Sequence, residues 1–349
     1  MFRVKFAAKV HLNVHCSQPN FVDVKIHQNA LSFQSDQPVV LTIGTFDGVH
    51  GGHRAVLRQL AERARELGAQ TALLTFDPHP RTVLHPEPHG LRLLNTLGEK
   101  AALLEGVGVD HLVVHPFTMD LARMTPKEYV KDLFANGIRP LRVIVGYDHR
   151  FGRNREGQFE TLQNLGLVHG FEVEELAAHY EADTRVSSTK VREALAAGDV
   201  ATAARWLNAP YPLTGRVVRG DGRGRQWGIP TANLAPNMPL KLVPAEGAYA
   251  CWAHLEGEEQ AHPAMVNIGR RPTVSAAGER SIEAHLIGLD RDLYGRVVQL
   301  HFIERLRPEE RFASPEALVA QLQRDRAQTE AICRDADAAS PLFNPAFPA

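Results

Sequence analysis

Two histidines flank a glycine just after the first strongly apolar segment, in the order His50-x-Gly52-His53. Residues 39–43 are apolar and β-branched, which predicts a buried parallel strand, and residues 54–67 place apolar side chains at helical spacing. The turn between them is rich in glycine, so amides at the helix N-terminus face open space. Such a turn is a phosphate cradle, because unpaired N–H groups and the helix dipole both favour an anion. The imidazoles beside it can donate hydrogen bonds to charge that develops on phosphorus.

The same histidines also fit a plain surface turn, or a zinc pair at positions i and i+3. Zinc needs further Cys, His or carboxylate ligands at known spacings, and none lies nearby in the sequence. The turn is not a Walker loop, since no Gly-Lys-Ser/Thr sequence follows it. The residue types favour phosphate binding over both alternatives.

A second phosphate-binding pattern begins a later predicted helix, in Ser187-Ser188-Thr189-x-x-Arg192. Ser or Thr at a helix start is usually just an N-cap, and the segment taken alone favours that explanation. With Arg192 one turn further on, the same geometry can place hydroxyls, amides and a guanidinium on one phosphate. Arginine suits this task because it is always charged and fork-shaped.

The C-terminal half carries another glycine-rich basic loop, with Gly220, Gly224 and Arg225, followed by Pro-Thr231-Ala-Asn233. Such a loop lets backbone amides wrap phosphates. The oxygens of Thr231 and Asn233 are hard ligands suited to Mg²⁺ with nucleotide phosphates. Without the second half of the pattern, a plain hairpin would be the better explanation.

The composition limits the classes of function. A formal net charge of −1 and a pI near 7.0 give no electrostatic footprint for nucleic acid or an anionic membrane. No apolar run approaches the roughly 20 residues that span a bilayer, and the N-terminus lacks a signal-peptide core. The three cysteines are far apart and odd in number. We therefore expect free thiols in a reducing cytoplasm.

The elements that position these residues fall into two patterns. From residue 39 to about 186, apolar strands alternate with helices, which predicts a doubly wound, Rossmann-like parallel sheet with ligands at the carboxyl ends of its strands. The first predicted strand is 39–43, and the strands expected after it are 71–76, 111–115, 142–145 and 171–176. The predicted helices are 98–106, 126–136, 158–166, 188–197 and 199–207.

Beyond a boundary near residue 208 the pattern changes to closely spaced strands, which predicts a small antiparallel β-barrel followed by a helix at 314–334. The strands are expected at 213–219, 249–255, 264–268, 281–289 and 297–304. Each half exceeds the roughly 100 residues of a typical domain, so each is expected to have its own core. The predicted divisions are an N-terminal extension of unclear role (1–38), two domains (39–208 and 209–335) and a disordered tail (336–349).

Within the extension, residues 22–26 are compatible with a short strand. Its histidines and cysteine match no standard metal site; they are His11, His15, Cys16 and His27.

The longer string Gly44-x-Phe46-Asp47-Gly48-Val49-His50-x-Gly52-His53 closely resembles the opening motif of the bacterial bifunctional riboflavin kinase/FAD synthetases. Its core resembles that of the wider nucleotidylyltransferase superfamily, and Ser-Ser-Thr-x-x-Arg resembles the element that completes that site. Residues 146–152 resemble a further family motif, with Asp148 and Phe151 matching and His149 in place of the usual Phe. A strand-end turn with a core Phe is the alternative for this segment. The resemblance places the segment beside flavin and ATP.

Residues 215–234 closely resemble the riboflavin kinase signature, with Trp227 and Ile229 varying the usual Leu and Phe. The resemblance implies that Glu283 is the general base for the riboflavin 5′-hydroxyl, although a lone Glu on a strand is usually solvated. It also implies that Arg307 and Phe312 bind flavin.

The resemblance covers about residues 39–330 and implies a cytoplasmic two-step enzyme. ATP phosphorylates riboflavin to FMN, leaving ADP, and a second ATP adenylylates FMN to FAD with release of pyrophosphate; both steps need Mg²⁺. His50, His53 and Arg192 would neutralise charge at the α-phosphate. The residues implied to bind ATP or phosphate are Gly44, Phe46, Asp47, Gly48, Gly52, Ser187, Ser188, Thr189, Gly220, Gly224 and Arg225.

Two other functions stay open: a single-activity riboflavin kinase with an inactive N-terminal domain, and a non-catalytic flavin carrier. The intact His-x-Gly-His and Ser-Ser-Thr-x-x-Arg elements argue against the first. The retained Glu283, Thr231 and Asn233 argue against the second. The sequence does not indicate an oligomeric state.

Overall fold

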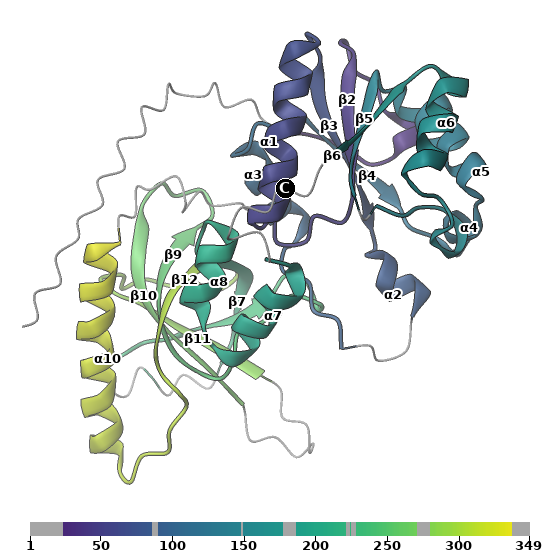
Figure 1. Cartoon of the computed structure of the whole chain (residues 1–349). Helices are drawn as coiled ribbons and strands as arrows, with labels where there is room; N and C mark the ends of the chain where they lie inside the picture. The colour runs from purple at the N-terminus through teal and green to yellow at the C-terminus, as the bar shows by residue number, and fades with distance from the viewer. Residues whose placement is uncertain are drawn as a thin grey trace, which may run out of the picture.

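The computed structural model describes residues 24–85, 90–147, 149–176, 186–220, 224, 228–270 and 280–336. One lobe is built on a parallel sheet with helices on its faces, and the other is a closed β-barrel flanked by the C-terminal helix (Figure 1). This architecture confirms the predicted fold class.

Six strands form the sheet in the order β1-β4-β3-β2-β5-β6, and every neighbouring pair is parallel. Every residue of β2 is buried, as expected for a central strand covered on both faces. The order reverses between β2 and β5, so the loops after these strands lie at the topological switch point. The strands are β1 (Lys25–His27), β2 (Val39–Ile43), β3 (Gln70–Asp77), β4 (His111–Pro116), β5 (Arg142–Gly146) and β6 (Glu172–Leu176).

Helices cover both faces of this sheet. Leu57 and Leu60 of α1 and Leu104 of α3 pack on one face, and Tyr129 of α5 and Leu162 of α6 pack on the other. The helix predicted at 126–136 is α5 continued by a π-helix, η2. The helices of this lobe are α1 (Gly51–Glu66), α2 (Pro80–Leu84), α3 (Leu97–Glu105), α4 (Met119–Arg123), α5 (Pro126–Val130), η2 (Lys131–Ile138) and α6 (Phe159–His169).

Part of the N-terminal extension belongs to the sheet. Strand β1 pairs with β4 at the sheet edge, and the His27 ring lies 4.7 Å from the Phe33 ring and 5.1 Å from the His111 ring, between centroids. Residues 25–33 therefore cover an edge that would otherwise expose unpaired backbone groups. Three of the extension residues considered as metal ligands, His11, His15 and Cys16, lie outside the described residues.

The barrel closes in the order β10-β11-β8-β7-β12-β9, with antiparallel pairs throughout. Strand β8 was not among the predicted strands, because its residues read as part of the Pro-Thr-Ala-Asn turn. It lies between β11 and β7. The elements are β7 (Tyr211–Val218), β8 (Ala232–Pro236), β9 (Gly247–Leu255), β10 (Ala261–Arg270), β11 (Arg280–Leu286), β12 (Val297–Arg307) and the outer helix α10 (Pro315–Asp335).

Helices α7 (Ser188–Ala197) and α8 (Val200–Leu207) share the hydrophobic core of the barrel. Leu195 and Leu207 lie in one buried cluster with Tyr211 and Leu300, and Figure 1 shows both helices against the barrel. The expected boundary near residue 208 marks the change of sequence pattern, but the hydrophobic core of the barrel extends across it to α7 and α8. The two helices therefore belong to the barrel by packing.

Among the helices that the structure describes, none is both long enough and apolar enough to cross a membrane. The tail predicted to be disordered lies outside the described residues from 337 onward.

Candidate active sites

The loop between β2 and α1 is a tight turn fixed from several sides. Phe46, Gly48 and Val49 all have positive φ, at 44°, 92° and 43°. The Gly48 amide donates to Asn95 Oδ1 at 2.7 Å, and a Cβ at Gly48 would lie 2.7 Å from Leu94 Cδ1. Position 48 thus needs a residue that tolerates positive φ and has no side chain, which explains why it is a glycine.

His50 and His53 lie ring on ring at the start of α1. Their centroids are 3.7 Å apart with an interplanar angle of 18°, and the Phe46 ring lies 4.7 Å from that of His53. His50 occupies the N-cap position without using its side chain as a cap. Both Nδ1 atoms are buried without a hydrogen-bond partner in the described part of the chain. Both histidines therefore lie at the N-terminus of α1, as the sequence predicts, and each has a ring nitrogen that a ligand can bind.

Burial disfavours the charged form of both imidazoles. The pKa of His50 is lowered to about 4 because burial outweighs the opposing effect of Asp47, and Arg192 adds to the lowering. Burial, His50 and Lys100 hold the pKa of His53 well below its ordinary value. Near pH 7 the two rings can exchange hydrogen bonds with a phosphate but supply no full positive charge.

Asp47 joins the two predicted phosphate motifs. It is 4% exposed; its Oδ1 accepts from the amides of Leu94 and Asn95 at 2.9 and 3.3 Å, and its Oδ2 accepts from Arg192 Nη2 at 2.5 Å. Arg192 Nε also donates to the Arg92 carbonyl at 2.7 Å. The ion pair positions the guanidinium beside the histidine loop, although the two residues are 145 positions apart.

The hydroxyl residues before Arg192 have distinct places. Ser187 is the N-cap of α7 and accepts from the Lys190 amide at 3.3 Å, as the structural alternative predicts. Ser188 donates to the Asp47 carbonyl at 2.8 Å, while Thr189 is exposed at the helix start. The N-terminus of α7 thus meets the loop that begins α1.

Lys100 is a cation of this site that the sequence analysis missed. Its Nζ donates to the Thr45 carbonyl at 2.8 Å and lies 3.4 Å from Thr75 Oγ1. Burial lowers its pKa, while Asp47 and Asp77 raise it. A charged residue on a helix usually faces solvent. Apart from the position of Lys100 in the apolar helix predicted at 98–106, nothing in the sequence therefore indicated that this side chain is buried in a site.

The loop after β5 places one of its two predicted flavin residues, Phe151, in the core. Phe151 is 6% exposed and packs in the core against Tyr129, with ring centroids 5.5 Å apart. This packing agrees with the alternative of a core Phe, and a contact of this segment with flavin stays a prediction. Asp148 lies outside the described residues.

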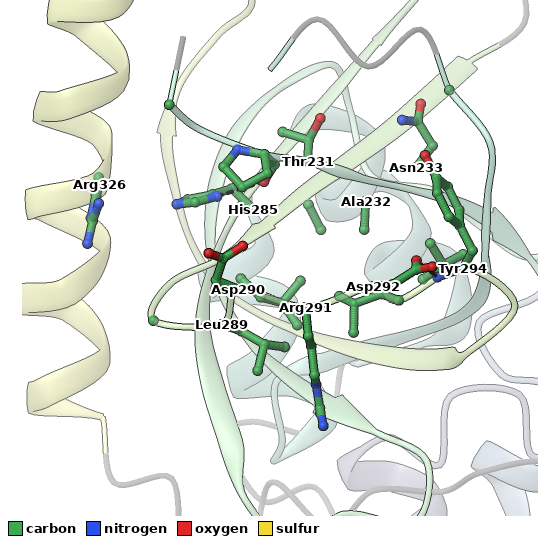
Figure 2. Close-up of a pocket in the computed structure, with 18 residues that line it drawn as sticks. Thr231, Ala232, Asn233, His285, Leu289, Asp290, Arg291, Asp292, Tyr294 and Arg326 are labelled. Carbon is green, nitrogen blue, oxygen red and sulfur yellow. Dashed lines mark hydrogen bonds between the residues drawn. The ribbon is translucent and has the colours of Figure 1, made fainter. Parts of the chain in front are cut away.

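A cavity of about 810 Å³ opens at the edge of the barrel (Figure 2). Thr231 and Asn233 line it together with Asp292 and Tyr294. The chain approaches closely here: a Cβ at Gly220 would lie 2.0 Å from Asn233 Nδ2. The predicted glycine-rich loop therefore lies against the predicted pair Thr231 and Asn233, with Gly220 next to the Asn233 side chain.

Gly224 is equally restricted, since a Cβ there would lie 2.3 Å from the Ile229 carbonyl oxygen and 3.2 Å from Thr231 Oγ1. The predicted phosphate contact Arg225 lies outside the described residues.

Glu283 lies beside this pair of oxygen donors. It is directly opposite Asn233 in the β11–β8 register, and Thr231 Oγ1 donates to Glu283 Oε2 at 3.4 Å. His285, two residues on, hydrogen-bonds through Nδ1 to the Pro230 carbonyl at 2.8 Å, and burial lowers its pKa. A carboxylate, a hydroxyl and an amide are thus gathered at one edge of the barrel.

The predicted flavin residues Arg307 and Phe312 contact each other, with the guanidinium carbon 5.3 Å from the ring centroid. Arg307 also pairs with Asp325 of α10, whose side chain is 2% exposed, at 2.9 Å. Burial, Glu246 and Glu283 raise the pKa of nearby Glu309, while Arg307 lowers it. Asp325 and Glu309 were not predicted as site residues, although Glu309 lies in the same short segment as Arg307 and Phe312.

Within the described ranges, no three His, Cys, Asp or Glu side chains gather in a way that would hold a metal ion.

Two family models match the chain. The model described as FAD synthetase matches residues 32–190, and the model described as riboflavin kinase matches residues 207–333. A Pseudomonas fluorescens protein named bifunctional riboflavin kinase/FMN adenylyltransferase is 41% identical over 84% of this chain and 92% of its own length. A protein of the same name from Bacillus subtilis is 32% identical, over 86% of this chain and 94% of its own.

A crystal structure titled macrolide-efflux protein, from Streptococcus pneumoniae, superposes with a TM-score of 0.78 at 28% identity. It covers 88% of this chain and 99% of that one. This likeness supports the two-lobed fold.

Proposed function

The chain belongs to the family of bifunctional riboflavin kinase/FMN adenylyltransferases, and we propose that each lobe carries one of the two reactions. The protein phosphorylates riboflavin to FMN with ATP and adenylylates FMN to FAD. We assign adenylylation to the loop after β2 and phosphorylation to the barrel edge.

In the adenylylation, an oxygen of the FMN phosphate forms a bond to the α-phosphorus of ATP, and the bond from that phosphorus to the bridging oxygen breaks. Pyrophosphate leaves with the electron pair. The FMN phosphate is already ionised, so no general base is needed. Arg192 and Lys100 supply positive charge, and the neutral imidazoles of His50 and His53 supply hydrogen bonds to the phosphates.

In the phosphorylation, the riboflavin 5′-hydroxyl attacks the γ-phosphorus of ATP and ADP leaves. Glu283 accepts the hydroxyl proton and orients the oxygen, which matters more than base strength for phosphoryl transfer. Gly220 and Gly224 let the backbone of the glycine-rich loop pack directly against Asn233 and Thr231, so this part of the loop lies beside the two oxygen donors.

Mg²⁺ fits the barrel site. Thr231, Asn233 and Glu283 present oxygen donors within one cluster, and a Mg²⁺ ion that completes its shell with water and phosphate needs only one or two protein ligands. Thr231 and Asn233 would hold the ion, which would neutralise charge on the transferring phosphates. A cytoplasmic location is also proposed, and the free buried thiols of Cys251 and Cys333 support it.

The observation that carries the assignment is the Asp47–Arg192 pair, because it brings both phosphate motifs of the first lobe to one point. A direct test incubates the protein with riboflavin and MgATP and separates the flavins by chromatography. The proposal predicts FAD. Accumulation of FMN alone would support the single-activity kinase, and unchanged riboflavin would support the flavin carrier.

A further inference from the structure

A short segment of the first lobe, residues 93–95, links the barrel lobe to the adenylylation loop. Leu93 donates to the Leu240 carbonyl at 2.8 Å and accepts from the Leu242 amide at 2.9 Å, in a two-bond parallel ladder between the lobes. The next two amides, of Leu94 and Asn95, bind Asp47 Oδ1. The same three residues thus contact the barrel on one side and the adenylylation site on the other.

Lys241 fixes this segment from within the barrel lobe. Its side chain is fully buried, and its Nζ donates to the Leu94 carbonyl at 2.6 Å and to Glu99 Oε2 at 2.5 Å. The Nζ also lies 4.5 Å above the Tyr211 ring. A buried ammonium ion is costly unless it is paired and hydrogen-bonded, so these contacts hold Lys241 in one place.

Glu99 completes the attachment from α3. Its Oε2 accepts from the Thr96 amide in the capping box, and its Oε1 accepts from the Thr214 hydroxyl of β7 at 2.8 Å. The ion pair therefore has its lone pairs satisfied on both sides of the interface. Replacing either member will affect stability, but of the two only Lys241 binds a peptide group whose N–H donates to Asp47, whereas Glu99 binds the next amide, that of Thr96.

We propose that Lys241 of the kinase lobe is a positioning residue for FMN adenylylation, which acts through Leu94, Asp47 and Arg192. The Leu94 carbonyl that Lys241 binds belongs to the same peptide group as the Asn95 amide, which donates to Asp47 together with the Leu94 amide, and Asp47 holds the Arg192 guanidinium. The proposal rests on the proposed role of Arg192 in that reaction. It means that the adenylylation site of this chain is complete only when the barrel is docked.

Three variants separate positioning from stability. Lys241→Met removes the bond to Leu94 and leaves Glu99 unpaired. Glu99→Gln removes the charge pair but keeps the Leu94 bond. The Glu99→Gln/Lys241→Met double variant removes the bond without leaving a buried charge unpaired, so it carries the test if Lys241→Met fails to fold.

Arg92→Ala is the matched interface control. It removes a hydrogen bond to the Pro239 carbonyl between the lobes, while the Arg92 backbone carbonyl stays available to Arg192. All variants are assayed as full chains for conversion of supplied FMN to FAD, for riboflavin phosphorylation and for thermal unfolding, below the lowest melting temperature.

We expect kcat for adenylylation to fall about 5- to 100-fold in both variants that lack Lys241, since small misplacement of a charged group has effects of this size. Phosphorylation should stay within about threefold, and Glu99→Gln and Arg92→Ala should adenylylate within about threefold of the parent. Equal losses in Glu99→Gln and Lys241→Met would overturn the proposal in favour of a purely structural pair, as would parent rates in the double variant. If the parent itself made no FAD from FMN, the proposed function would fail instead.

Discussion

At the scale of single residues, the first site combines neutral imidazoles with separate cations. His50 and His53 lose their charge through burial, whereas Arg192 is held by Asp47 and Lys100 by the Thr45 carbonyl. Neutral rings that stack at 3.7 Å avoid the repulsion that two imidazolium ions would suffer. The histidines therefore contribute directed hydrogen bonds, and the arginine and lysine contribute the charge.

Replacing His53 tests the first half of this assignment. His53→Ala should lower FMN adenylylation by roughly 10²-fold or more, the typical effect of losing one charge-stabilising donor. Riboflavin phosphorylation should survive, so FMN should accumulate from riboflavin and MgATP. His115→Gln is a control for the loss of a buried imidazole in the same lobe, since His115 bonds to Asn29. Parent-rate FAD formation by His53→Ala would show that the motif has another role.

Replacing Glu283 tests the second half. Glu283→Gln should slow riboflavin phosphorylation by about 10²–10⁴-fold, the usual contribution of a positioned base. The variant should still convert supplied FMN to FAD, because Glu283 lies at the barrel edge. Initial rates of both reactions on one preparation measure this, and equal loss of both in a folded variant would refute the role.

A buried histidine away from both sites predicts a pH dependence of stability. Burial, with His27 and Lys25, lowers the pKa of His111 to about 4 against the opposing effect of Asp110. The unfolded chain protonates this residue near pH 6.5 while the folded chain does not, so stability falls as pH drops from about 6.5 toward 4. One such group contributes at most about 1.4 kcal/mol per pH unit.

His111→Gln should therefore flatten the fall of the unfolding free energy between pH 6.5 and 4.5. Glutamine can keep a polar contact with Gln70, which the imidazole now makes at 2.9 Å. Urea titrations at several pH values give the slope for parent and variant. Parallel slopes would contradict the assignment of a neutral buried imidazole.

At the scale of elements, the turn between β2 and α1 depends on a glycine that has no room for a side chain. Gly48→Ala would force a Cβ to 2.7 Å from Leu94 in a left-handed backbone, so we expect a loss of about 1–3 kcal/mol and at least about tenfold slower adenylylation. Gly68→Ala is the matched control: φ is also positive, at 60°, but no atom lies within 4 Å of its Cβ. If both variants behaved alike, crowding at Leu94 would not limit the site.

An element could be predicted where its own residues carry the signal, such as a capping residue or a periodic apolar pattern. Helix α7 has the predicted bounds because Ser187 caps its start and Gly198, with positive φ, ends it. Strand β8 was missed because its first residues, Ala232 and Asn233, belong to the Pro-Thr-Ala-Asn motif, which was interpreted as a turn. Strand β1 is three residues long, too short for a periodic pattern.

The candidate site was predictable in its residues but less so in its contacts. The motifs identified the histidine loop and Arg192, yet nothing local shows that Asp47 binds Arg192 145 positions away. Lys100 and Lys241 are buried cations, and a lone charge in sequence usually indicates a solvated face. Their roles depend on partners that only the fold brings near.

At the scale of the whole molecule, the two lobes share more than a linker. Helix α7 bonds to the first site at its N-terminus, while its apolar face packs in the barrel core. A fragment of residues 1–208 would expose Leu195, Val200 and Leu207, and each such side chain contributes about 1.5–3 kcal/mol when fully buried. We expect this fragment to melt well below the full chain and to adenylylate FMN more slowly.

Thermal unfolding and FMN adenylylation, measured on the fragment and the full chain, check this expectation. Added fragment 209–349 should restore both in part if the interface can re-form. A fragment 1–208 with the melting temperature and rate of the full chain would show that the shared core is dispensable.

The central claim is that two separate sites on one chain act in sequence, and mixing the two single-site variants tests it most directly. Glu283→Gln alone should leave riboflavin nearly unchanged, and His53→Ala alone should stop at FMN. An equimolar mixture of the two full-length variants, supplied with riboflavin and MgATP, should produce FAD, because FMN released by one variant is adenylylated by the other. A mixture that accumulates FMN without FAD, although Glu283→Gln was folded, would contradict the account.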